Sequence, residues 1–149
     1  MSGCFEEQPC VIEEDDVSVL PESEYDDAEF VEWVKPTLVL ITAGVDNLVD
    51  SIDGGDITSE STIAHGQYLR DDSAKALEEI GNFEVSPELQ PYATEVAAFL
   101  NSSYYMGLYC AETNKTLDGL DQFFYNAEQA QIHSQRYSAL AKEYEAKNK

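Results

Sequence analysis

At 149 residues, the chain has the length of one typical domain and can bury a core without help from a metal or a disulfide. Its 30 acidic and 8 basic residues give a formal net charge of −22 and a pI near 4.1. A charge of this sign and size repels polyanions, so it argues against nucleic acid as a partner and against unassisted adhesion to anionic lipid. The sequence also has no run of about 18 apolar residues, the length that a transmembrane helix needs.

The acidic residues are concentrated at the start of the chain. Residues 1–60 hold 17 of them but only one basic residue, Lys35. Two interpretations stand: adaptation to high salt, where an acidic surface stays hydrated, or an acidic tail of the kind that ordinary organisms also use. Residues 1–22 show no helical period, which predicts a disordered acidic tail or tether ahead of a domain spanning residues 23–149.

Ser2-Gly3-Cys4 resembles the last three positions of a lipobox, the motif at which bacterial and archaeal lipoproteins are cleaved before a cysteine. The resemblance covers three residues, and the leucine and apolar segment that precede the cysteine in a lipobox are missing here. It implies lipid on Cys4, an extracytoplasmic location, and a flexible tether between membrane and domain. The alternative is a disordered cytoplasmic N-terminus that carries an ordinary cysteine.

Two cysteines are left once Cys4 is assigned to lipid. Cys10 and Cys110 form an even pair, which would allow one disulfide joining the tail to the domain in an oxidising compartment. The competing interpretation makes Cys110 a small buried apolar residue, because it falls on a core-facing helical position, and leaves Cys10 free.

Four segments with helical periodicity follow the tail. The first, residues 24–52, has apolar side chains three or four residues apart, which is typical of one buried helix face: Val34, Leu38, Ile41, Val45, Leu48 and Ile52. Pro36 predicts a kink or a division of this helix, because proline lacks the amide proton of a helical hydrogen bond. Gly54-Gly55 predicts its end, since consecutive glycines lose too much entropy to continue a helix.

The second segment, residues 58–82, begins at Thr58 or Ser59 and has a thin apolar face that includes Gly66 and Ser73. Small residues on this face favour either a close approach of neighbouring helices or a gap that another group fills.

The third and fourth segments are also amphipathic. The third, residues 86–110, starts with the helix-start sequence Ser86-Pro87-Glu88 and has the strictest period: Leu89, Tyr92, Val96, Phe99, Ser103, Met106 and Cys110. In the fourth, residues 117–144, the expected inner stripe is Leu117, Leu120, Phe124, Ala127, Ala130, Ser134, Tyr137, Ala141 and Tyr144. Long helices with short links must run antiparallel, so we predict an all-α fold, an up-down-up-down antiparallel four-helix bundle.

The sequence lacks the ligand patterns of the cofactors that such bundles commonly hold. A di-iron site needs Glu-x-x-His pairs, but neither His65 nor His133 has a glutamate three residues before it. No Cys-x-x-Cys-His motif is present for covalent haem, and the acidic loop at residues 50–61 fails the spacing of an EF-hand. We therefore expect no metal and no cofactor.

Catalytic patterns are equally scarce. The sequence has no Gly-x-Ser-x-Gly motif. Cys110 and His133 lie on neighbouring segments, but the helical rise predicts a separation of about 25 Å along the axis. The chain is therefore not expected to be an enzyme.

Aromatic residues are concentrated in the second half of the chain, where they are placed to line a groove between the third and fourth helices. This broad aromatic set is Tyr92, Tyr104, Tyr105, Tyr109, Tyr125, Tyr137, Tyr144, Phe99, Phe123 and Phe124. The ligand-groove residues that we single out are Tyr92, Phe99, Ser103, Met106, Phe124, Gln131, Ser134 and Tyr137. The alternative is that these side chains fill the bundle core, with the tyrosine hydroxyls reaching its rim.

Together these features predict a non-enzymatic, surface-tethered bundle that binds a small molecule or a partner protein outside the cytoplasm. In architecture alone it resembles extracytoplasmic ligand-sensing four-helix domains. The alternative is a soluble cytoplasmic interaction or scaffold protein that presents an acidic face to a basic partner. That alternative predicts binding that collapses when salt is added.

Overall fold

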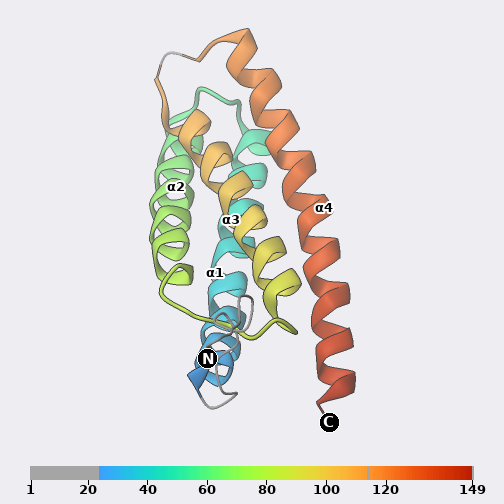
Figure 1. Ribbon diagram of the computed structural model, residues 1–149. Coiled ribbons are helices and arrows are strands. Elements are labelled where there is room, and N and C mark those ends of the chain that lie inside the picture. The colour runs from blue at the N-terminus through green and yellow to red at the C-terminus, as the bar shows by residue number, and fades with distance from the viewer. Residues whose placement is uncertain (1–23, 114, 149) are drawn as a thin grey trace, which may run out of the picture.

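The computed structural model describes residues 24–113 and 115–148, and these residues form the predicted all-α bundle. The helices are α1 (Asp27–Gly54), α2 (Glu60–Ile80), α3 (Gln90–Ala111) and α4 (Leu117–Lys147). Figure 1 shows them in up-down-up-down order, with the start of α1 and the end of α4 at the same end of the bundle. The predicted tail, residues 1–22 with Cys4 and Cys10, lies outside the described residues. No helix among those described is long and apolar enough to cross a membrane.

The helix ends follow the capping chemistry of the sequence. α1 stops at Gly54-Gly55, as the glycine pair predicts. The Ser59 hydroxyl accepts a hydrogen bond from the Thr62 amide at 3.2 Å, and the Thr116 hydroxyl accepts one from the Gly119 amide at 2.9 Å, so α2 and α4 each have a side-chain cap. The predicted division of the first helix at Pro36 is wrong, because α1 runs continuously through this residue. Pro36 is exposed, so water can satisfy the carbonyl that it leaves free.

The core is built from the inner stripes of the helices. Ile41 and Leu48 of α1, Leu69 of α2, and Val96 and Leu100 of α3 are each at most 1% exposed. All seven residues of the predicted stripe on the third helix are buried, which confirms its period. Residues on either side of this stripe are buried too, because α3 packs against both α2 and α4: Leu100, Ser102, Gly107 and Tyr109.

The α2–α3 interface shows the close approach that the small residues of α2 predict. A Cβ built on Gly66 would lie 2.7 Å from the Ala111 amide nitrogen. One built on Gly107 would lie 2.5 Å from the Arg70 amide nitrogen and 2.8 Å from the Gly66 carbonyl oxygen. The two helix backbones touch, and nothing fills a gap between them.

The α1–α4 side of the bundle is different, because these two helices have no backbone contact. Neighbours in sequence pack against each other, α1 on α2, α2 on α3 and α3 on α4, but no Cα of α1 lies within 8 Å of any Cα of α4. Only side chains join the two helices. The ring of four contacts that closes a typical four-helix bundle is therefore open on this side.

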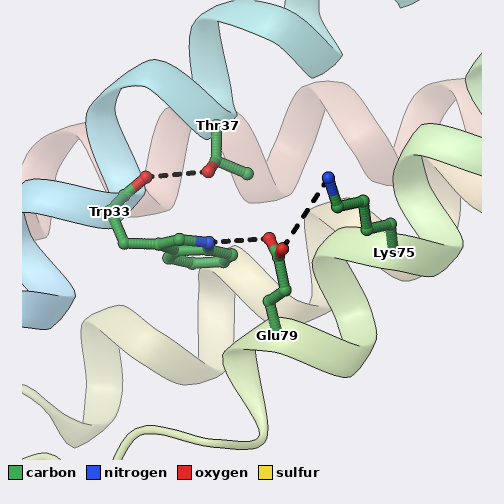
Figure 2. A network of polar contacts seen from close by, with 4 residues as sticks. All are labelled: Trp33, Thr37, Lys75 and Glu79. Carbon is green, nitrogen blue, oxygen red and sulfur yellow. Dashed lines mark hydrogen bonds and ion pairs between the residues drawn. The ribbon is translucent and has the colours of Figure 1, made fainter.

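A polar network joins α1 and α2 (Figure 2). The Trp33 indole nitrogen donates to a Glu79 carboxylate oxygen at 2.9 Å, and the other carboxylate oxygen lies 4.0 Å from the Lys75 ammonium. The Thr37 hydroxyl donates to the Trp33 carbonyl at 2.7 Å. The Trp33 ring packs on Phe83 with a centroid distance of 5.3 Å, so this residue anchors the start of α1.

Replacing Glu79 separates its two roles. Glu79→Ala leaves the Trp33 indole donor without its acceptor and is expected to lower the free energy of unfolding by about 1 kcal/mol. Glu79→Gln keeps an oxygen acceptor and loses only the ion pair with Lys75, whose side chain is 75% exposed, so a change below about 0.5 kcal/mol is expected. Urea unfolding followed by the fluorescence of Trp33, the one tryptophan in the sequence, measures both. Equal losses in the two variants would contradict this assignment.

Candidate functional site

The structure places most of the singled-out groove residues in the core. Phe99, Ser103 and Met106 are at most 4% exposed on the inner face of α3, and Tyr92 is 8% exposed. The Tyr137 ring comes from α4 and packs edge-on against Phe99 at a centroid distance of 5.4 Å and against Tyr92 at 6.4 Å. The Ser103 hydroxyl has no hydrogen-bond partner among the described residues. These side chains mostly fill the bundle, which is the core-filling alternative of the sequence analysis.

The start of α4 departs from the predicted stripe by one residue. Phe124, expected on the inner face, is 60% exposed, and Phe123 is 4% exposed in its place. Gln131 is exposed as well, while Ser134 is half-buried and donates to the Gln131 carbonyl at 2.8 Å. Phe123 and Phe124 are adjacent, and either one fits a three-four spacing that continues to Ala127, so the pattern alone does not choose between them.

A hollow of about 460 Å³ lies between the second half of α3 and the first turns of α4. Its size falls in the range of small-molecule sites in proteins. Four of the broad aromatic set line it, together with polar side chains that sequence reasoning did not select. The lining residues are Asn101, Tyr105, Leu108, Tyr109, Glu112, Gly119, Gln122, Phe123, Tyr125 and Asn126. We call this site the α3–α4 hollow.

The floor of the hollow consists of two buried rings held in place. Phe123 and Tyr109 are 4% and 9% exposed, with ring centroids 5.9 Å apart. The Tyr109 hydroxyl donates to the Thr116 carbonyl at 3.1 Å, across the turn between the two helices. Any Cβ at Gly119 would overlap the Tyr109 ring, so glycine is required for the ring to lie there. Burial raises the pKa of Tyr109 above its ordinary value of 10.0.

The rim of the hollow carries exposed aromatic and amide side chains. Tyr105 on α3 is 46% exposed and Tyr125 on α4 is 56% exposed. Asn101, Gln122 and Asn126 add side-chain amides, each with both donors and an acceptor. The Asn126 amide nitrogen donates to the Gln122 carbonyl at 2.8 Å, which fixes its position and leaves its own oxygen free to accept. The site therefore combines flat apolar surfaces with directional hydrogen-bonding groups.

A second hollow, of about 380 Å³, opens at the other end of the bundle between α1, α3 and α4. Its walls are mostly apolar, and it is lined by Val31, Val34, Lys35, Leu89, Tyr92, Ala141, Tyr144, Glu145 and Asn148. Tyr92 is the one singled-out groove residue that reaches either hollow. The second hollow offers fewer polar groups to orient a ligand than the α3–α4 hollow does.

One ion pair of partly buried side chains joins α3 and α4. The His133 ring nitrogen Nδ1 lies 2.6 Å from a Glu95 carboxylate oxygen, with side-chain exposures of 17% and 21%. Sequence reasoning missed this pair, because nothing in the local pattern links two residues on different helices. Cys110 lies 15 residues beyond Glu95 on α3, or about 22 Å, so it is remote from His133 as predicted. Among the described residues, no group of three or more His, Cys, Asp or Glu side chains is placed to hold a metal ion.

Cys110 has no disulfide partner among the described residues, and its side chain is fully buried. Burial raises its pKa to about 12, so the thiolate is not populated near neutral pH. Its predicted pairing with Cys10 stays a prediction, since Cys10 lies outside the described residues.

Burial of Tyr92 and Cys110 predicts a loss of stability in alkali. Burial raises both pKa values to about 12, from ordinary values of 10.0 and 9.0. The neutral forms stabilise the fold fully below about pH 9, and this contribution is lost as the pH rises towards 12. The free energy of unfolding should therefore fall over that interval in urea titrations at fixed ionic strength. The free energy of unfolding of Tyr92→Phe should fall less steeply than that of wild type. Tyr68→Phe, at a site that is 66% exposed, should lose stability as steeply as wild type.

Comparison of the chain with protein-family models, curated proteins and solved structures finds no match.

Proposed function

We propose that this chain is a non-enzymatic binding domain that takes a small molecule in the α3–α4 hollow and is held outside the cytoplasm by lipid on Cys4. The observation that carries the binding proposal is the fixed aromatic floor of the hollow, Tyr109 and Phe123, beneath a rim of exposed tyrosines and amides. A floor that is ordered before binding lowers the entropic cost of holding a ligand. The rim amides then select the ligand by its hydrogen-bonding groups.

The chemistry of the reactive side chains supports a binding role over a catalytic one. Cys110 is buried as a neutral thiol, so it is a poor nucleophile. His133 contacts Glu95 on the inner side of α3 and does not line the α3–α4 hollow. Three of the polar side chains that line the hollow are amides, which bind and orient ligands without exchanging protons near neutral pH. Glu112 is the one carboxylate in the lining, and no histidine or cysteine lies beside it there.

Ligand screening with matched variants tests the binding proposal. The panel contains free amino acids, mono- and disaccharides, nucleosides and quaternary amines, and thermal unfolding of the full chain is the readout. A compound present at about 100 times its dissociation constant should stabilise the fold by about 2.7 kcal/mol. Tyr105→Ala and Asn126→Ala should abolish this stabilisation, whereas Tyr68→Ala on α2 should preserve it, since Tyr68 is exposed and does not line the hollow. Stabilisation that survives both rim variants would contradict the proposal.

Intact mass tests the tether. Expression from the full native locus in the native host should give a chain carrying a diacylglyceryl or diether mass on Cys4. The cysteines are then alkylated without reductant in denaturant, because buried Cys110 is shielded from reagent in the folded protein whether or not it is paired. Protection of both Cys10 and Cys110 supports the disulfide. An unmodified chain with three reactive thiols would contradict the lipid anchor and the extracytoplasmic location.

A further inference from the structure

The α3–α4 hollow presents aromatic rings to a ligand and has no positive charge in its lining. Tyr109 and Phe123 form its buried floor. Tyr105 and Tyr125 add exposed rings at its rim. The face of an aromatic ring carries negative partial charge, so several rings around one space attract a cation. The lining also contains Glu112 but no lysine, arginine or histidine. It is therefore suited to a positively charged ligand.

The Glu112 carboxylate is available to such a ligand. This side chain is exposed at the end of α3 and makes no hydrogen bond or ion pair with residues 24–113 and 115–148. Lys115, the nearest base along the chain, donates from its ammonium to the Glu112 backbone carbonyl instead. An exposed carboxylate contributes little alone, so the aromatic rings carry most of the expected affinity.

The charges around the α3–α4 hollow are mostly negative. Residues 96–130, the stretch that contains the whole lining, have four acidic residues and one basic residue: Glu112, Lys115, Asp118, Asp121 and Glu128. Lys115 does not line the hollow. On α2, the backbone of Arg70 meets α3 at Gly107, and its guanidinium pairs with Asp71 at 2.8 Å. A field of this sign concentrates cations at the site and opposes anions.

We propose that the α3–α4 hollow binds a small quaternary ammonium compound that carries a hydroxyl group. This inference rests on the proposed function, because it names the ligand class of the same site. A quaternary nitrogen has no N–H group, so its methyl groups can lie on the aromatic rings without leaving a donor unsatisfied. A primary ammonium has three N–H donors to satisfy, and the lining supplies one carboxylate. The hydroxyl pairs with the rim amides, where Asn126 presents its side-chain oxygen as an acceptor.

Calorimetric titration of the full chain with choline tests the ligand class, and two analogues serve as matched probes. The carbon analogue of choline has a tert-butyl group in place of the trimethylammonium group, so it keeps the shape and the hydroxyl without the charge. It should bind about tenfold more weakly or worse. Glycine betaine keeps the trimethylammonium group but has a carboxylate in place of the hydroxyl. It should also bind more weakly than choline, since no base lines the hollow.

Variants of the rim separate the aromatic rings from net charge. Tyr105→Leu/Tyr125→Leu keeps apolar bulk but removes two rings, so its affinity for choline should fall about tenfold or more. Tyr105→Phe/Tyr125→Phe keeps both rings and should bind choline more tightly than the leucine variant does. The matched control is Tyr68→Leu on α2, exposed and outside the hollow, which should bind like wild type. Circular dichroism verifies that each variant keeps its helices.

The outcomes distinguish this inference from the proposed function. Preference for choline over both analogues, with loss of affinity in the leucine variant, supports the inference. Tighter binding of the carbon analogue, or of another compound in the screening panel, that is lost in Tyr105→Ala would overturn the ligand class but keep the hollow as the binding site. Equal affinity of wild type and the leucine variant for choline would show that choline follows net charge and would also overturn it. If neither choline nor any compound of the panel binds, both proposals fail.

Discussion

Gly107→Ala is expected to lower the free energy of unfolding by about 3 kcal/mol, one of the largest effects of any single methyl group in this chain. The added Cβ would lie 2.5 Å from the Arg70 amide nitrogen and 2.8 Å from the Gly66 carbonyl oxygen. Both are backbone atoms of α2, so no flexible side chain can move aside and the two helices must separate. The separation weakens the packing of Leu69 and Leu100, which are at most 1% exposed. Urea unfolding followed by circular dichroism measures the change.

The matched control for Gly107→Ala is the same substitution in α1. A Cβ at Gly54 meets no atom within 4 Å, and alanine favours the helix over glycine by about 1 kcal/mol. Gly54→Ala is therefore expected to leave stability unchanged or to raise it slightly. If Gly107→Ala behaves like Gly54→Ala, then α2 and α3 do not approach as closely as described.

The fold follows from the sequence where the pattern allows one solution. On α3, the stripe from Leu89 to Cys110 predicts seven buried residues, and all seven are buried. The end of α1 could be predicted from Gly54-Gly55 because the conformational preference of glycine acts locally. The start of α2 could be predicted from Ser59 because helix capping is local too. The close α2–α3 contact was one of two predictions for a face of small residues, and the structure selects it.

The site was predicted only in outline, because it depends on contacts between helices. Tyr105, Tyr109, Phe123 and Tyr125 belong to the broad aromatic set expected between the third and fourth helices, and all four line the hollow. The amides at its rim were missed, since surface asparagine and glutamine have no periodic signal. The open side between α1 and α4 was missed for a related reason. Each helix shows which face is apolar, but not how far its neighbour stands from it.

The start of α4 shows why one residue of register changes the site. Phe123, Phe124 and Tyr125 follow one another, so an aromatic residue is available for the buried position in more than one register. The structure buries Phe123 against Tyr109, which forms the floor of the hollow, and leaves Phe124 exposed. A stripe through Phe124 would instead turn Phe123 away from Tyr109 and remove the floor.

Alanine substitution at these two adjacent positions decides the register. Phe123→Ala is expected to lower the free energy of unfolding by about 3–5 kcal/mol, because it removes a ring that is 4% exposed and leaves a cavity beside Tyr109. Phe124→Ala, at a ring that is 60% exposed, is expected to cost less than about 1 kcal/mol. Urea unfolding of the two variants, measured side by side, gives the difference. The reverse order would place Phe124 in the core, as the sequence pattern first predicts, and would remove the floor of the hollow.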